Sequence, residues 1–167
     1  MTTEITLAPK EKRYVLANMW TAYAHELSQY QTDLPSVHGL MGDEDGDYDP
    51  ESIMAEWWEH PEGAFPYLLS VDERPAGFAL VAAPPLVDGD MDKMLLEFFL
   101  FHPYRGKGLG RAAAHKVFAQ FAGSWELSVI TSNTPALEFW KATLEDAVVS
   151  QKVIDELPMT VFSFLRG

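Results

Sequence analysis

The chain has 167 residues, of which 47% are hydrophobic, and its formal net charge at neutral pH is −13. This length and composition can bury one sizeable core, so we expect a single domain over residues 1–167. The absence of cysteine excludes disulfides, thiolate nucleophiles and cysteine-based zinc sites. No apolar run approaches the roughly 20 residues that cross a bilayer, and the first residues do not resemble a signal peptide. We therefore expect a cytoplasmic protein without a membrane partner.

The negative charge is concentrated in one half of the sequence. Between Tyr14 and Glu73 there are 13 acidic residues and no Lys or Arg, whereas the remainder carries 12 acidic and 12 basic residues. Such a field repels polyanions and attracts small cations. We therefore expect no nucleic-acid partner.

The N-terminal part predicts a strand, a long helix and an acidic loop. Residues 5–8 are a candidate strand. Apolar residues over 9–30 recur at spacings of four and three, which predicts an amphipathic helix. Glycine, proline and acidic residues over 33–50 predict an irregular loop, and 52–59 predicts a short helix. The apolar stripe of the long helix consists of Leu16, Trp20, Tyr23, Leu27 and Tyr30.

The central part predicts three strands followed by a helix. Two strand candidates, 67–71 and 77–83, are separated by a turn-rich segment and predict a hairpin. The most hydrophobic strand candidate follows at 94–101. Apolar residues then repeat every four positions over 108–121, which predicts a helix that Gly123 stops.

The C-terminal part predicts a strand, a short helix and a strand pair. The strand candidate covers 126–131. Thr134 is a suitable N-cap and is followed by proline, which predicts a helix over 134–141. Residues 148–153 and 159–165 predict two antiparallel strands.

A glycine-rich loop joins the apolar strand to the alanine-rich helix. Residues 103–111 read Pro-Tyr-Arg-Gly-Lys-Gly-Leu-Gly-Arg. Glycine permits sharp turns and close approach of the backbone, and the first amides of a helix are unpaired, so this segment predicts a phosphate cradle. Arg105, Lys107 and Arg111 could add charge-assisted contacts, although their side chains could instead lie in solvent. A Walker A loop is excluded because Gly108 follows the lysine, and the late position in the chain disfavours a Rossmann loop.

Residues 94–140 resemble the acyl-coenzyme A binding core of the GNAT N-acetyltransferases. The resemblance rests on the strand at 95–101 and on the loop Arg105–Gly110, which fits R/Q-x-x-G-x-G/A. It rests also on Asn133–Trp140, which is similar to N-x-x-A-x-x-F-[Y/W]. These segments are most similar to a bacterial branch known mainly as predicted acetyltransferases. The order of elements along the whole chain fits the same family.

The resemblance implies a mixed α/β (α+β) fold with a largely antiparallel central sheet flanked by helices. The strands at 94–101 and 126–131 would splay apart and admit acetyl-CoA as co-substrate, with its pyrophosphate on the glycine loop. Asn133 would orient the pantetheine arm, or would be only a polar turn residue before a helix. The implied binding residues are Phe99, Leu100, Phe101, Arg105, Gly106, Lys107, Gly108, Leu109, Gly110, Arg111 and Asn133.

Glu97 is the only charged residue between Lys93 and His102. Acylation of an amine requires removal of a proton from an ammonium whose pKa is near 10. A carboxylate in apolar surroundings has a raised pKa and can act as general base. The resemblance also implies a base on this strand, so Glu97 is our candidate catalytic residue. The alternatives are an exposed glutamate or one paired to a cation, and His102 is a minor alternative base.

The general acid has no assigned residue. The family usually has a tyrosine where this chain has Trp140, and tryptophan gives no proton at neutral pH. Tyr104 or a water molecule would then protonate the leaving thiolate, or the thiolate would leave without a proton donor. We expect Trp140 to be a packing residue, beside the pantetheine or in the core.

The acidic half of the chain points to the acceptor. In the family this half helps to build the acceptor side, where Trp57 or Trp58 could face a cationic amine or could instead pack in the core. Asp43, Asp45 and Asp47 only superficially resemble an EF-hand loop, because this chain lacks the glycine and the final glutamate that such a loop requires. The histidines are not spaced as metal ligands. We therefore expect no metal.

We predict an N-acetyltransferase that moves acetyl from acetyl-CoA directly to a primary amine, that of a small cationic molecule, in a ternary complex. The alternatives are a non-catalytic acyl-CoA sensor, motivated by the missing tyrosine, and an acidic module that docks a basic protein. The acceptor's identity and the oligomeric state stay open, a homodimer included.

Overall fold

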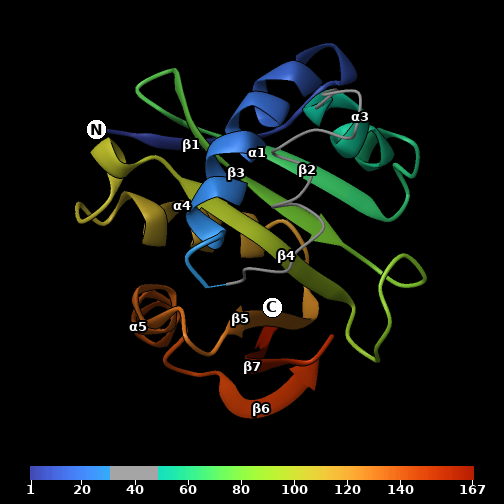
Figure 1. Ribbon diagram of the computed structural model, residues 1–167, viewed down its shortest axis with the longest axis vertical. Helices are drawn as coiled ribbons and strands as arrows, with labels where there is room; N and C mark the ends of the chain where they lie inside the picture. Colours follow the sequence, from blue (N-terminus) through green and yellow to red (C-terminus); the bar gives the residue numbers. More distant parts are fainter. Residues whose placement is uncertain (31–48) are drawn as a thin grey trace.

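The computed structural model describes residues 1–30 and 49–167 of the chain. Within these residues a seven-stranded sheet has the order β1-β2-β3-β4-β5-β7-β6 (Figure 1). β4 and β5 run parallel and the other neighbouring strands run antiparallel, which confirms the predicted largely antiparallel sheet. The strands are β1 (Thr3–Leu7), β2 (Ala64–Val71), β3 (Arg74–Ala82), β4 (Lys93–Leu100), β5 (Gly123–Ile130), β6 (Val148–Ile154) and β7 (Leu157–Arg166).

Helices cover both faces of this sheet. Leu68 of β2 joins the core under α1, whereas its neighbour Leu69 joins the core under α4, because successive side chains of a strand point to opposite faces. None of the helices described here combines the length and apolar character of a bilayer span. The helical segments are η1 (Lys10–Lys12), α1 (Arg13–Leu27), α3 (Pro50–Ala55), η2 (Glu56–Trp58), η3 (His102–Tyr104), α4 (Leu109–Phe118) and α5 (Thr134–Thr143).

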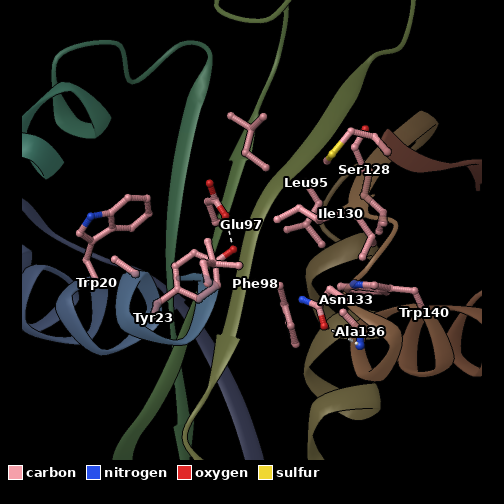
Figure 2. A pocket seen from close by; sticks show the side chains of 16 residues that line it. Trp20, Tyr23, Leu95, Glu97, Phe98, Ser128, Ile130, Asn133, Ala136 and Trp140 are labelled. Carbon is pink, nitrogen blue, oxygen red and sulfur yellow. Dashed lines mark hydrogen bonds between the residues drawn. The ribbon is translucent and has the colours of Figure 1, made fainter. Parts of the chain in front are cut away.

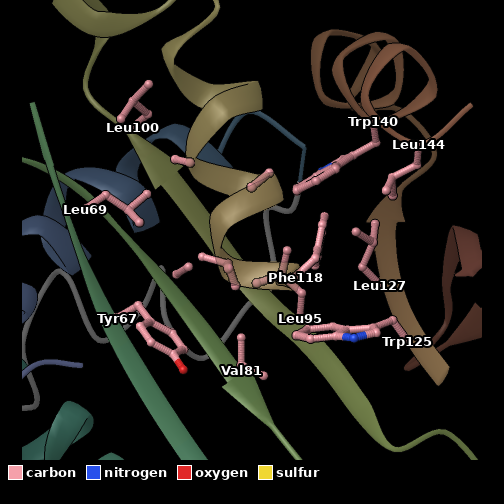
Figure 3. Packing of buried hydrophobic residues seen from close by; sticks show 14 of the residues in the cluster. Tyr67, Leu69, Val81, Leu95, Leu100, Phe118, Trp125, Leu127, Trp140 and Leu144 are labelled. Atoms are coloured by element: carbon pink, nitrogen blue, oxygen red, sulfur yellow. The ribbon is translucent and has the colours of Figure 1, made fainter. Parts of the chain in front are cut away.

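Two hydrophobic cores hold the sheet from both sides. The larger core lies between the sheet and α4 and α5 (Figure 3). Its rings meet edge to face, with Phe118 at 5.1 Å from Trp125 and 4.9 Å from Phe164 between centroids. The smaller core, which includes Leu16 and Phe78, lies under α1 and α3. The strands that carry the site are therefore fixed by packing on both faces.

Several predicted boundaries are corrected by local structure. The first long helix begins at Arg13, after a short 3-10 turn, and ends at Leu27. The second helix starts earlier than predicted because the Asp49 side chain caps it. α4 ends at Phe118, and Gly123 opens β5 with a φ of 114° instead of stopping the helix. The acidic loop predicted over 33–50, like the EF-hand-like aspartates, falls almost entirely outside the described residues.

The predicted hairpin of β2 and β3 is confirmed, but its turn is tighter than expected. Asp72 and Glu73 form a two-residue connection with φ values of 48° and 65°. This is the geometry in which the twist of the turn matches the twist of the strands, so β3 begins already at Arg74. β3 of this hairpin then pairs with β4 along the edge of β4 that faces away from β5.

β4 and β5 separate in the middle of the sheet, as predicted. They pair only from Lys93 to Leu95 on β4 and from Trp125 to Leu127 on β5. Beyond these residues β4 remains paired to β3, and β5 remains paired to β7, while their facing edges diverge. The sheet therefore contains an opening lined by two unpaired strand edges.

Candidate active site

A cavity of about 330 Å³ lies where β4 and β5 diverge (Figure 2). α1 forms one wall, the two strands form the floor, and the start of α5 forms the opposite wall. Glu97 lies between the two walls in Figure 2. The lining residues are Trp20, Tyr23, Ala24 and Leu27 of α1, Leu95–Phe98 of β4, Leu127–Ile130 of β5, Asn133, Ala136 and Trp140 at α5, and Met159 of β7.

A bulge in β4 directs Glu97 into this cavity. Leu80 of β3 opposes Glu97, but the next residue, Val81, opposes Leu95, so Leu96 is an additional residue in β4. A bulge re-aims the side chains that follow it. In a regular strand, residues three apart face opposite sides of the sheet. Because of the bulge, Phe98 and Leu95 instead pack on the same side, toward α4 and α5, and Glu97 faces α1.

Glu97 is held by a tyrosine of α1. The Tyr23 hydroxyl donates a hydrogen bond to Oε2 of Glu97. Burial raises the pKa of Glu97 to about 7, against the opposing effect of this hydrogen bond. Burial and the neighbouring carboxylate raise the pKa of Tyr23 well above its ordinary value, so Tyr23 keeps its proton. The half-buried Glu97 is thus neither an exposed glutamate nor paired to a cation among the described residues, and its charge changes near neutral pH.

This raised pKa predicts how stability depends on pH. Between pH 4.5, the ordinary pKa, and about 7 the folded protein binds more protons at Glu97 than the unfolded chain, so stability falls as pH rises through this window. We expect the melting temperature of Glu97→Gln to exceed that of wild type at pH 8 and to be close to it at pH 5. Each kcal/mol gained in the free energy of unfolding should raise the melting temperature by roughly 2–4 °C. Thermal unfolding followed by circular dichroism measures this. Glu138→Gln, an exposed exchange on α5, is the control; a pH-independent difference at Glu97 would contradict the assignment.

The glycine loop presents backbone to open space. Gly106 and Gly108 have φ values of 69° and 76°, which favour glycine, and a Cβ built on either would meet nothing within 4 Å. The amide of Ala112 donates to the carbonyl of Gly108, so helix geometry leaves the amides of Leu109–Arg111 without intrahelical partners. Leu109 itself packs in the core. This arrangement fits the predicted anion cradle.

Arg105 does not fit the role predicted for it. Its amide donates to the carbonyl of His102, its Nε donates to the carbonyl of Leu100 at 2.5 Å, and its guanidinium binds both carboxylate oxygens of Glu26 at 2.8 and 3.0 Å. His102 also contacts Glu26, at 3.1 Å. Both the amide and the side chain of Arg105 are therefore engaged within the protein. We therefore start the proposed cradle at Gly106.

Two other cations remain beside the loop. Lys107 is exposed and donates to the carbonyl of Pro103 at 2.7 Å. Arg111 is exposed on the first turn of α4. Gly110, the second residue of α4, faces Phe139 of α5, whose ring would lie 3.3 Å from an added Cβ. The cradle is thus basic on its outer side and packed closely against α5 on its inner side.

The pairing of β4 decides which of its amides face the cavity. The Phe101 amide donates to the carbonyl of Ala76, on the β3 side, at 2.9 Å. Because hydrogen-bonding direction alternates along a strand, Phe99 shares this orientation, and Phe98 and Leu100 direct their amides to the diverging edge. The amides of Phe99 and Phe101, two of the implied binding residues, therefore point away from the opening and toward β3. The binding role of Leu100 stays a prediction with which this direction agrees, and Phe98 is a residue that the sequence did not indicate.

The start of α5 closes the cavity. Asn133, and not Thr134, is the N-cap, and its side chain accepts a hydrogen bond from the Ala136 amide at 3.2 Å. Asn133 therefore has the capping role of a polar residue before a helix and also lies at the cavity. Trp140 is 6% exposed and meets Phe98 edge to face at 5.3 Å, which confirms its predicted packing role.

Sequence reasoning missed Tyr23 and left open the positions of several other aromatic residues. The apolar stripe put Tyr23 on a buried face, but a stripe does not show which of its members reaches a carboxylate. Trp57 and Trp58 do not line the cavity and pack against the α1 core, where the Trp58 indole donates to the Ala8 carbonyl at 2.7 Å. Tyr104 packs in the larger core. In residues 1–30 and 49–167 no group of three or more metal-ligating side chains is present.

Comparison with known proteins places these features in a family context. The model of the acetyltransferase (GNAT) family matches residues 20–144. No curated protein matches the chain. An acetyltransferase from Thermus thermophilus is 16% identical, with a TM-score of 0.67 over 99% of this chain and 98% of its own.

Two further structures were solved with the coenzyme. PaiA N-acetyltransferase from Thermoplasma acidophilum, in complex with coenzyme A, is 14% identical, with a TM-score of 0.68 over 98% of this chain and 100% of its own. YncA from Salmonella typhimurium, with its cofactor acetyl-CoA, is 13% identical, with a TM-score of 0.63 over 99% and 94%. At these identities the likeness establishes the fold.

Proposed function

Because the chain belongs to the GNAT acetyltransferase family, we propose that it transfers acetyl from acetyl-CoA directly to the primary amine of a small cationic acceptor. The observation that carries this proposal is Glu97, a carboxyl with a pKa of about 7 at the point where β4 and β5 separate. A base of this pKa can take a proton from an ammonium near neutral pH.

The glycine loop and the diverging edge of β4 support the binding of acetyl-CoA. The pyrophosphate is assigned to the amides of 106–110, with Lys107 and Arg111 beside them. The pantetheine arm is assigned to the opening between β4 and β5, where Phe98 and Leu100 offer amides and Asn133 lies at the far wall. When bound, acetyl-CoA supplies an activated thioester.

In the proposed transfer, Glu97 accepts a proton and a β4 amide polarises the acyl group. Tyr23 occupies Oε2 of Glu97, which leaves Oε1 to accept the proton of the acceptor ammonium. An amide of Phe98 or Leu100, fixed in the sheet, can polarise an acyl oxygen without reorganising. Neither Trp140 nor Tyr104 serves as acid in this scheme, and Tyr23 holds its proton too tightly, so the thiolate leaves without a side-chain donor.

Release of free thiol from acetyl-CoA tests the proposal. The protein is incubated with acetyl-CoA and a panel of primary amines, and acetyl-CoA binding is measured in parallel by calorimetry. Amine-dependent thiol release supports N-acetyltransfer. Binding without release for any amine would instead identify an acyl-CoA sensor, and absence of binding at millimolar acetyl-CoA would favour the protein-docking alternative.

Replacing Tyr23 by Phe is expected to move the acidic limb of kcat/KM to higher pH. The hydroxyl stabilises the charged form of Glu97, so its loss should raise the Glu97 pKa further. A hydrogen bond to a charged group that contributes about 1.4 kcal/mol corresponds to a shift of about one pKa unit. The pH dependence of kcat/KM for one amine measures the shift. Tyr14→Phe, an exposed exchange on the same helix, is the matched control. An unmoved limb would assign Tyr23 to packing alone.

A further inference from the structure

The α1 wall of the cavity is apolar and aromatic. Trp20, Tyr23, Ala24 and Leu27 recur at helical spacing along one face of α1. Trp20 and Tyr23 meet edge to face with ring centroids 5.6 Å apart. Phe78 of β3 packs behind both, at 6.3 and 5.5 Å. The wall is therefore a fixed surface and not a set of loose side chains.

This wall lies across Glu97 from the residues assigned to acetyl-CoA. Figure 2 shows Trp20 and Tyr23 on one side of the carboxylate and Ile130 and Asn133 on the other. An acceptor whose nitrogen reaches Glu97 therefore places its carbon body against α1. The side chains of that helix determine which body fits.

The cavity provides one negative charge for an acceptor. Among its described lining residues Glu97 is the only carboxylate. The neutral polar side chains include Tyr23, whose hydroxyl already donates to Glu97, Asn133, which is engaged as a cap, and Ser128. Glu26, on the same helix as the wall, already pairs with the guanidinium of Arg105 at 2.8 Å. A second ammonium inside the cavity would meet no further carboxylate among the lining residues that the structure describes, and burial of an unpaired charge is strongly unfavourable.

We propose that the acceptor is a primary monoamine with a bulky apolar body, aromatic or branched, and that polyamines and aminoglycosides are poor substrates. This inference rests on the proposed N-acetyltransfer. The ammonium pairs with Glu97, the edge of the body contacts Trp20, and the remaining apolar surface is buried against Leu27 and Leu96. Apolar contact area, and not multiple charge, sets the selectivity.

The test compares kcat/KM for 2-phenylethylamine, ethylamine and spermidine at saturating acetyl-CoA and 0.15 M salt. We expect 2-phenylethylamine to exceed each of the others by at least tenfold. Spermidine equal to or better than 2-phenylethylamine would overturn the inference and leave N-acetyltransfer standing. If acetyl-CoA binds but none of the amines causes thiol release, the proposed function and this inference are both overturned.

Two variants of Leu27 test the role of charge on the wall. Leu27→Glu adds a second carboxylate to a half-buried position of the α1 wall, and Leu27→Gln adds the same shape without charge. We expect Leu27→Glu to raise the ratio of spermidine to 2-phenylethylamine kcat/KM at least tenfold over Leu27→Gln. Equal ratios in the two variants would contradict an acceptor site on this wall.

Discussion

Replacing Glu97 by Gln is expected to lower kcat by roughly 10²–10⁴-fold, the usual contribution of a general base, while acetyl-CoA binds as in wild type. Glutamine keeps the size of the side chain, and its carbonyl oxygen can still accept the Tyr23 hydroxyl. The exchange therefore removes proton acceptance and little else. Steady-state thiol release with a saturating amine measures kcat, and calorimetry measures acetyl-CoA affinity.

The pH profile separates this effect from general damage. In wild type, kcat/KM should rise with pH through about 7, because Glu97 must lose its proton before it can act. In Glu97→Gln this limb should disappear. Glu138→Gln is the matched control and should retain both the rate and the limb. A Glu97→Gln protein with wild-type turnover would remove Glu97 from the mechanism.

Replacing Gly108 by Val is expected to weaken acetyl-CoA binding at least tenfold with a smaller effect on kcat at saturation. Gly108 has a φ of 76° and forms the N-cap of α4. A residue with a Cβ is destabilised by roughly 1–2 kcal/mol in this conformation, and a β-branched one by more, so the loop is shifted toward another shape. The added carbons would also occupy the space that is now open beside the loop. Calorimetric titration with acetyl-CoA measures the loss.

A strained glycine elsewhere controls for loss of stability. Gly123, the first residue of β5, has a φ of 114° and is not part of the glycine loop, and an added Cβ would lie 2.4 Å from the Asp92 carboxylate. Gly123→Ala should lower the melting temperature yet leave acetyl-CoA affinity near wild type. If Gly108→Val binds acetyl-CoA as tightly as Gly123→Ala does, the loop is not the pyrophosphate site.

Local patterns in the sequence predicted the fold and the frame of the site. The loop at Gly106–Gly110 was predictable because its glycines and the flanking periodicities are contiguous in sequence. The divergence of β4 and β5 followed from the family resemblance and is confirmed by where their pairing stops. Trp140 was correctly expected to pack because tryptophan has no proton to give and much apolar surface to bury.

The chemistry of the side chains was less predictable because it depends on distant contacts. Tyr23 reaches Glu97 across 74 positions, and Glu26 reaches Arg105 across 79. No glycine in the sequence indicates the bulge at Leu96. The alternation of residues along β4 therefore could not show which amides face the cavity. The acceptor's chemical class and the bacterial branch stay predictions.

The ion pair between Glu26 and Arg105 limits how far the two halves of this enzyme could be exchanged separately. Arg105 immediately precedes the loop to which we assign the pyrophosphate. Glu26 lies on α1, to which we assign the acceptor wall, so the ion pair connects the two proposed sites. A loop transplanted from another enzyme without its helix would leave a carboxylate unmatched, and a transplanted helix would leave a cation unmatched. If these assignments hold, donor and acceptor recognition are not independent modules in this chain, and we expect recombination between homologues to succeed only when both segments are carried together.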